Sequence, residues 1–165
     1  MKQLFSTIVI LLTAVVFDSA IAQHKSLSSY DNPTLNGSAV NASNVNMKAL
    51  KDFSKSFKSV TGEKWYAVED GFFASFSDNG IDTKVAYDKK GNWHSTLRTL
   101  DETQLPFAVR DNVKSVYYDA KILVGYEIKS RDGSVYIIKT EDSKTLKTLR
   151  VVDGNIEVIS DNIRG

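Results

Sequence analysis

The fold is decided by the stretch Thr83-Lys-Val-Ala-Tyr-Asp-Lys-Lys-Gly-Asn-Trp-His-Ser-Thr-Leu-Arg98. Short β-prone runs on either side of its polar centre predict two strands, 83–87 and 93–99, joined by a hairpin turn. Gly91 and Asn92 suit that turn, because glycine and asparagine tolerate a positive φ. Downstream, Leu105-Pro106 opens a helical run, since proline fits the first helical turn, where its missing N–H is not needed. The predicted order is strand, turn, strand, helix.

A helix is also predicted before this stretch. Met47, Leu50, Phe53, Phe57 and Val60 fall at spacings of three and four residues, which marks one apolar helical face. A glycine at 62 supplies the left-handed stop that often ends a helix.

The remaining strands repeat the same order. Runs at 64–68 and 72–76 follow the first helix, and four more follow the second, at 121–129, 134–140, 145–152 and 155–160. Asp70-Gly71 recurs as Asp132-Gly133, and Gly91-Asn92 recurs as Gly154-Asn155. The chain is therefore predicted to be α+β, a tandem repeat of a helix followed by a four-stranded antiparallel meander, with the helices packed on one face of the sheet.

The N-terminus is interpreted as a signal peptide over residues 1–22. Lys2 precedes an apolar run, and Ala20-Ile21-Ala22 forms a small-x-small cleavage site. The apolar run is too short to cross a bilayer, so no membrane insertion is expected after cleavage. We expect a flexible leader at 23–43 and one domain at 44–165, with units at about 44–101 and 102–161. The mature protein is expected to be periplasmic or secreted.

Composition narrows the partners. Lys and Arg number 21 against 20 acidic residues, so the chain lacks the net positive charge of a nucleic-acid or anionic-lipid binder. Because of this charge balance, we expect no nucleic acid among the partners. The chain also has no cysteine, which excludes disulfides, a thiol nucleophile and thiolate metal sites.

Several motifs together resemble a known family. They are Trp65, Asp70-Gly71-Phe72, Val85-Ala-Tyr-Asp88 with Gly91-Asn-Trp93, and Leu105-Pro106. They are similar to the PepSY-like, β-lactamase-inhibitor-like domain family of exported proteins of Gram-negative bacteria. The resemblance covers about residues 46–159 and rests on turn glycines, core aromatics and the helix-opening proline. It implies the tandem architecture and an open sheet face, and it assigns no inhibitory residue.

The pattern of reactive side chains does not favour catalysis. His94 is the only histidine of the predicted domain, and no nucleophile motif accompanies it. The acidic pairs Glu69-Asp70, Asp101-Glu102 and Glu141-Asp142 fall at turns or strand ends, where carboxylates cap the backbone. We predict no catalytic residue, no metal site, no cofactor and no enzymatic activity.

Alternation along the strands predicts which residues face the helices. The helix side is expected to carry Phe72, Ala74, Phe76, Val85, Tyr87, Trp93, Leu97, Ile122, Val124, Tyr126, Ile128, Val135, Ile137, Leu149 and Val151. The open side is expected to carry Phe73, Ser75, Lys84, His94, Thr96, Arg98, Glu127, Tyr136, Thr148 and Arg150.

Five residues of that open side are the predicted binding residues: Phe73, His94, Arg98, Tyr136 and Arg150. Aromatic and arginine side chains are enriched at interface centres. The predicted function is an exported, non-enzymatic module that binds a protein or peptide of the cell envelope, with inhibition of an exported hydrolase as one form of it. The alternative is a periplasmic protein that senses a small ligand or envelope stress. The sequence does not decide the oligomeric state.

Overall fold

The computed structural model describes residues 37–163. The predicted signal peptide at 1–22 and residues 23–36 of the leader predicted at 23–43 lie outside the described residues. The elements are β1 (Ser38–Val40), a 3-10 turn η1 (Ala42–Asn44), α1 (Met47–Ser56), β2 (Lys64–Val68), β3 (Gly71–Asp78), β4 (Ile81–Asp88), β5 (Trp93–Leu100), α2 (Phe107–Val116), β6 (Lys121–Ser130), β7 (Gly133–Glu141), β8 (Thr145–Val152) and β9 (Asn155–Ile163).

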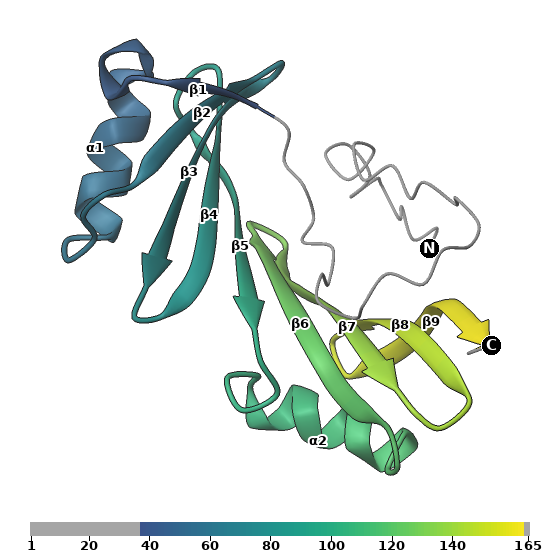
Figure 1. Ribbon diagram of the computed structural model, residues 1–165. Helices are drawn as coiled ribbons and strands as arrows, with labels where there is room; N and C mark the ends of the chain where they lie inside the picture. The colour runs from purple at the N-terminus through teal and green to yellow at the C-terminus, as the bar shows by residue number, and fades with distance from the viewer. Residues whose placement is uncertain (1–36, 164–165) are drawn as a thin grey trace, which may run out of the picture. The chain divides into compact units, whose positions relative to one another are not determined.

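The strands form one nine-stranded antiparallel sheet in chain order, β1 to β9 (Figure 1). Each helix is followed by a four-stranded meander, β2–β5 after α1 and β6–β9 after α2. The two meanders join where β5 pairs with β6. The predicted α+β class and the tandem order are confirmed. Within the described residues, neither helix is long and apolar enough to cross a membrane.

Both units end their helices in the same way. Phe57 (φ −125°, ψ 62°) follows α1, and Tyr117 (φ −120°, ψ 61°) follows α2. Each donates its N–H to the residue four positions back, Phe53 (2.8 Å) or Val113 (2.9 Å). The shared geometry places Phe53 and Val113 at equivalent positions of the two units.

The sheet begins inside the stretch predicted to be a flexible leader. Ser38 to Val40 form β1, which pairs with β2 and places Val40 opposite Trp65. Val40 also packs against the core under α1. A leader extending to residue 43 is therefore wrong for its last residues, because pairing with β2 orders them. The Ser-Ala-Val strand is too short to show a period in the sequence.

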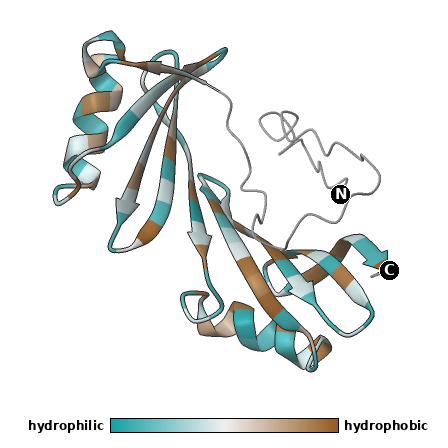
Figure 2. Cartoon of the chain, viewed as in Figure 1, coloured by the Kyte–Doolittle hydropathy of each residue, from teal (hydrophilic) through white to brown (hydrophobic). Residues whose placement is uncertain are grey.

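Each helix covers its own core. Under α1 the core is largely aromatic, with Phe53, Trp65, Phe76 and Tyr87 in one cluster with smaller side chains such as Ala49. Under α2 it is aliphatic, built from Leu100, Leu105, Val113, Ile122, Ile138, Leu149 and Val151. Figure 2 shows hydrophobic and hydrophilic residues alternating along the strands that carry these cores.

The register places both helices on one face. Val85, in the core of α1, lies opposite Thr96 on β5. Side chains two positions apart on a strand share a face, so Arg98 and Leu100 point the same way as Thr96. Leu100 belongs to the core of α2. The predicted packing of both helices on one face is therefore confirmed.

Two β-bulges reverse the predicted facing of β5 and β6. Ala86 pairs with Ser95 and Tyr87 pairs with Trp93, so His94 is the extra residue on β5. Leu123 is the extra residue on β6, between Ile122 and Val124. An extra residue shifts the alternation by one position.

The predicted facing is wrong beyond these bulges. Residues predicted to lie under the helices face away from them: Leu97, Val124, Tyr126, Ile128, Val135 and Ile137. Residues predicted on the open side lie on the helix side: Thr96, Arg98, Glu127 and Tyr136. On β7 the error has another cause. In Val135-Tyr-Ile-Ile138 both sets of alternate residues are apolar or aromatic, so the alternation does not show which set faces the helices. There the pairing of Gly125 with Ile138 decides the face.

Candidate functional site

A polar strip, here called the floor, lies on the helix side of β5, β6 and β7. It consists of Thr96, Arg98, Glu127, Lys129 and Tyr136. Along β5, Trp93 packs against the core of α1 and Leu100 belongs to the core of α2. The floor residues Thr96 and Arg98 lie between these two positions. The floor therefore lies between the two cores, at the junction of the two units, with Tyr136 packed against the core of α2.

The centre of the floor is one carboxylate held from two sides. Arg98 Nη1 lies 3.3 Å from Glu127 Oε2, and the Tyr136 hydroxyl donates to Glu127 Oε1 at 2.9 Å. The Glu127 side chain is only 13% exposed, whereas that of Arg98 is 36% exposed. Burial, and then the hydrogen bond to Glu127, raise the pKa of Tyr136 to about 12. The three side chains form a fixed network with the guanidinium partly open to solvent.

An open groove of about 450 Å³ adjoins this strip. It runs between α1, the β4–β5 turn and the β6–β7 hairpin. Trp93 links the groove to the floor, because its indole N–H donates to Thr96 Oγ1 at 3.0 Å. The groove is lined by Lys48, Lys51, Asp52, Lys55, Gly91, Asn92, Trp93 and Arg131.

A second hollow of about 320 Å³ shares three residues with the groove, namely Asn92, Trp93 and Arg131. Asp88, His94, Ser130 and Asp132 complete its lining. The bulge of β5 therefore brings His94 to this hollow.

The N-terminus of α1 is fixed against the β4–β5 turn. Asn46 Oδ1 accepts from the N–H of Lys48 (2.9 Å), and Asn46 Nδ2 donates to the carbonyl of Lys89 (3.1 Å). Gly91 has a φ of +75°, and a Cβ there would lie 2.6 Å from Asn46 Oδ1 and 2.8 Å from the N of Ala49. Only glycine allows this close approach, so the wall of the groove is held in place.

The carboxylates near the groove already have partners. Asp52 Oδ2 accepts from the Tyr87 hydroxyl (3.1 Å), and burial raises the pKa of Tyr87 above its ordinary value. Asp88 accepts from the side chain (2.7 Å) and the N–H (2.8 Å) of Asn92. These hydrogen bonds lower the pKa of Asp88. Lys48 also donates to the side chain of Asn92.

Three cationic side chains of the groove have no carboxylate partner among the described residues. Across residues 37–163, the ion pairs use Arg98, Lys114, Lys147 and Arg150. Lys51, Lys55 and Arg131 make no ion pair with any described residue. The groove therefore carries an excess of free positive charge.

The five predicted binding residues do not share one surface. Arg98 and Tyr136 meet at Glu127 on the floor, and exposed His94 lines the neighbouring hollow. Phe73 faces away from the helices, is 3% exposed and stacks on Tyr66 with ring centroids 4.7 Å apart. Arg150 also faces away and pairs with Glu157 at 3.2 Å. The predicted common face is wrong, and buried Phe73 is not available for contact.

Four residues of the candidate site were not predicted from the sequence: Lys51, Lys55, Trp93 and Arg131. The lysines at 48, 51 and 55 are spaced to share one helix face, which was a usable signal. Nothing local indicates that Arg131 approaches them, since it lies in the other unit. Among residues 37–163, no group of three or more His, Asp or Glu side chains is arranged to hold a metal ion.

Comparison with known proteins gives matches in structure alone, since no family model and no curated protein matches the chain. A BLIP-like protein of Bacteroides fragilis has a TM-score of 0.58 at 17% identity, over 72% of this chain and 86% of its own. A DUF2874 family protein of Bacteroides ovatus has a TM-score of 0.58 at 17% identity, over 72% and 87%.

A protein of Bacteroides eggerthii, provisionally named periplasmic, has a TM-score of 0.57 at 14% identity, over 72% and 88%. At these identities the likeness concerns the fold. The resemblance to a β-lactamase-inhibitor-like domain is confirmed at that level.

Proposed function

We propose that this protein is an exported, non-enzymatic module that binds a protein or peptide partner in the cell envelope. Its contact surface is the floor together with the adjoining groove. The observation that carries the proposal is the gathering of Trp93, Arg98 and Tyr136 at the junction of the two units. Tryptophan, tyrosine and arginine are the residue types most enriched among the side chains that dominate binding energy.

The hydrogen bonds of the floor favour binding. Trp93 is held by Thr96, while Arg98 and Tyr136 are held by Glu127. A side chain that is already ordered loses little conformational entropy when a partner covers it. The Arg98 guanidinium keeps part of its surface open. The floor thus supplies preorganised anchors beside a groove that a partner segment can enter.

The shared fold adds support of a weaker kind. A BLIP-like protein has the same architecture, and the N-terminal sequence has the pattern of a signal peptide. A fold hosts many functions, so inhibition of an exported hydrolase is one form that the binding could take.

Capture with matched arginine variants tests the site. The chain from Gln23 is used as bait in a cell-envelope extract, as wild type, Arg98→Met and Arg150→Met. Both arginines pair with a glutamate on a neighbouring strand, Glu127 or Glu157, but on opposite faces of the sheet. We expect Arg98→Met to lose a partner that Arg150→Met retains, with unchanged circular dichroism. Equal retention by the two variants would remove the floor from the binding surface.

A small-ligand sensor is the second candidate, favoured by the size of the groove. The groove has a volume of about 450 Å³, which is enough for a small molecule, and it is open to solvent. A ligand that binds only the folded state raises the melting temperature with concentration. A saturable shift with an envelope metabolite fraction, abolished by a groove variant, would favour this candidate over the protein partner.

A further inference from the structure

The groove concentrates positive charge that the chain as a whole does not have. Its lining includes Lys48, Lys51, Lys55 and Arg131 against one carboxylate, Asp52. The whole chain carries a net charge of only +1. Since Asp52 accepts a hydrogen bond from Tyr87, its carboxylate is directed toward the core side of α1. The groove therefore attracts anions more strongly than the average surface does.

The arrangement of these cations suits an extended peptide. Lys51 and Lys55 are four residues apart on α1, which is a rise of about 6 Å along the helix axis. Alternate side chains of an extended chain repeat at about 6.8 Å. Carboxylates at every second position of a peptide can therefore meet successive lysines of α1. Arg131 on the opposite wall can take a further carboxylate, in the bidentate way that arginine favours.

The neighbouring hollow argues against a continuous polyanion. Asp88 and Asp132 line it directly beyond Trp93 and Arg131. A nucleic acid or sulfated polysaccharide presents negative charge without interruption and would meet these carboxylates. A peptide can carry acidic residues over the lysines and neutral residues over the hollow. The half-buried ring of Trp93 between the two offers apolar contact for the peptide backbone or a neutral side chain.

We infer that the groove between α1 and the β6–β7 hairpin docks an acidic, extended segment of the partner, with its carboxylates on Lys51, Lys55 and Arg131. This inference rests on the proposed function and specifies the chemistry of the partner. The floor anchors the body of the partner, and the groove selects the acidic segment.

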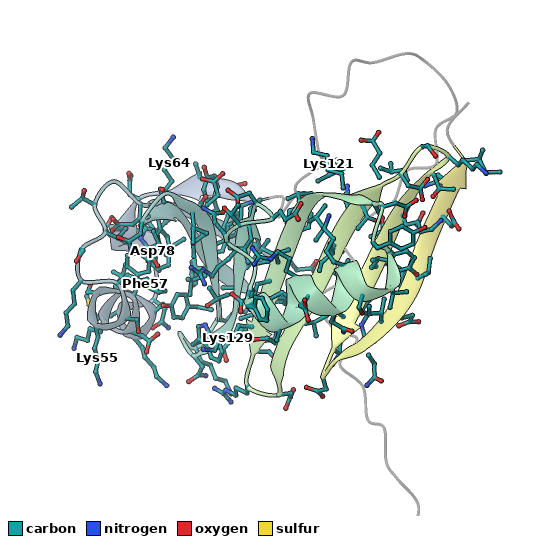
Figure 3. The ribbon with its side chains drawn as sticks, turned by 90° about the horizontal axis from the view of Figure 1, so that it is seen from below. Lys55, Phe57, Lys64, Asp78, Lys121 and Lys129 are labelled. Atoms are coloured by element: carbon teal, nitrogen blue, oxygen red, sulfur yellow. The ribbon has the colours of Figure 1, made fainter. Side chains whose placement is uncertain are left out.

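Two lysine pairs give a matched test. Figure 3 shows Lys55 on the lower side of the view, with Lys64 and Lys121 on the upper side. All four lysines concerned, 51, 55, 64 and 121, are exposed. The variants Lys51→Glu/Lys55→Glu and Lys64→Glu/Lys121→Glu therefore change the net charge equally, at the groove and away from it.

The probe is a fluorescein-labelled peptide of alternating alanine and glutamate, with an alanine–glutamine peptide as its uncharged control. Fluorescence anisotropy is recorded with the chain from Gln23 in about 50 mM salt, where exposed charges are weakly screened. We expect saturable binding of the glutamate peptide and no binding of the glutamine control peptide. The groove pair should weaken binding by about tenfold or more, and the distant pair by less than about twofold, because only the groove pair turns close attraction into repulsion.

Three results would overturn the inference: no binding of the glutamate peptide, equal weakening by both lysine pairs, or tighter binding of a single-stranded oligonucleotide of equal charge. Failure of this inference can be distinguished from failure of the proposed function, because peptide binding and Arg98-dependent capture are measured separately. If the envelope partner is still captured through Arg98 while the glutamate peptide does not bind, the acidic segment is wrong and the binding module stands. If the peptide binds but no partner depends on Arg98, the groove stands and the role of the floor falls.

Discussion

Helices α1 and α2 end with the same backbone geometry but present different surfaces to solvent. The groove side of α1 carries Lys48, Lys51 and Lys55. Helix α2 exposes two large apolar side chains, Phe107 (70%) and Val116 (57%), where α1 exposes one, Met47 (63%). The cores differ too, since α1 covers an aromatic core and α2 an aliphatic one. The repeat thus preserves turns and caps, while the side chains on the frame differ between the units.

The difference has a spatial counterpart. The β6–β7 hairpin of the second unit supplies Arg131 to the groove beside α1. Among the described strands, β9 is the last of the sheet, so no further hairpin lies in the same position beside α2. The candidate site is therefore a product of joining two units and not a property of either one.

The largest predicted difference between the two units is the stability lost when equivalent core residues are truncated to alanine. Phe53 is 4% exposed and contacts the rings of Phe57, Trp65 and Phe76 at 5.1 to 5.4 Å. Phe53→Ala should lower the free energy of unfolding by about 3 to 5 kcal/mol. Val113→Ala, at the matching position under α2, should cost only about 2 kcal/mol, since fewer buried atoms are lost. Urea unfolding followed by circular dichroism measures both, and equal losses would show that the cores are energetically alike.

The turn glycines should show the next largest difference. Gly91 and Gly154 both have positive φ, +75° and +79°, in equivalent turns. A Cβ at 91 meets Asn46 and Ala49, whereas a Cβ at 154 meets nothing within 4 Å. We expect Gly91→Ala to cost about 2 to 3 kcal/mol and Gly154→Ala about 1 kcal/mol. Urea unfolding measures both losses of stability. A smaller loss at Gly91 than at Gly154 would contradict the close packing of α1 on the β4–β5 turn.

Most of the fold could be predicted from the sequence, because its signals are local. Turn glycines, the helix-opening proline and short β-prone runs gave the element order. The facing of β5 and β6 could not be predicted, since the bulges at His94 and Leu123 leave no mark in the alternation. On β7 the alternation gave no answer, because the run 135–138 is apolar on both faces. The candidate site was missed for a related reason. Arg131 approaches α1 only through the pairing of β5 with β6, and no local pattern encodes that approach.

Helix capping should differ between the units by a smaller amount. Asn46 caps α1 by accepting from the Lys48 N–H, and it also bonds Lys89. Pro106, at the start of α2, makes no side-chain cap. We expect Asn46→Ala to cost about 1 to 2 kcal/mol and Pro106→Ala less than about 0.5 kcal/mol in chemical denaturation. A similar loss at both positions would mean that the tie between α1 and the β4–β5 turn contributes little.

The smallest predicted effect concerns the β3–β4 and β7–β8 turns, which reverse the chain by different means. The first uses positive φ at Asn79 (51°) and Gly80 (81°). The second uses the Asp142 carboxylate, which accepts from the N–H groups of Lys144 and Thr145, both at 2.7 Å. These hydrogen bonds, that of Lys144 first, lower the pKa of Asp142 from its ordinary value of 3.8 to about 2.

Because the folded state lowers this pKa, the stabilisation is present above about pH 4 and is lost as the pH falls from 4 to 2. Carboxyl NMR titration should therefore give Asp142 a pKa near 2. The Asp142→Ala variant should lose less of its free energy of unfolding than the wild type does between pH 4 and pH 2. Ser143→Ala on the same turn is the control, since its side chain makes no described hydrogen bond. An ordinary pKa at Asp142 would mean that the second turn, like the first, depends on backbone conformation alone.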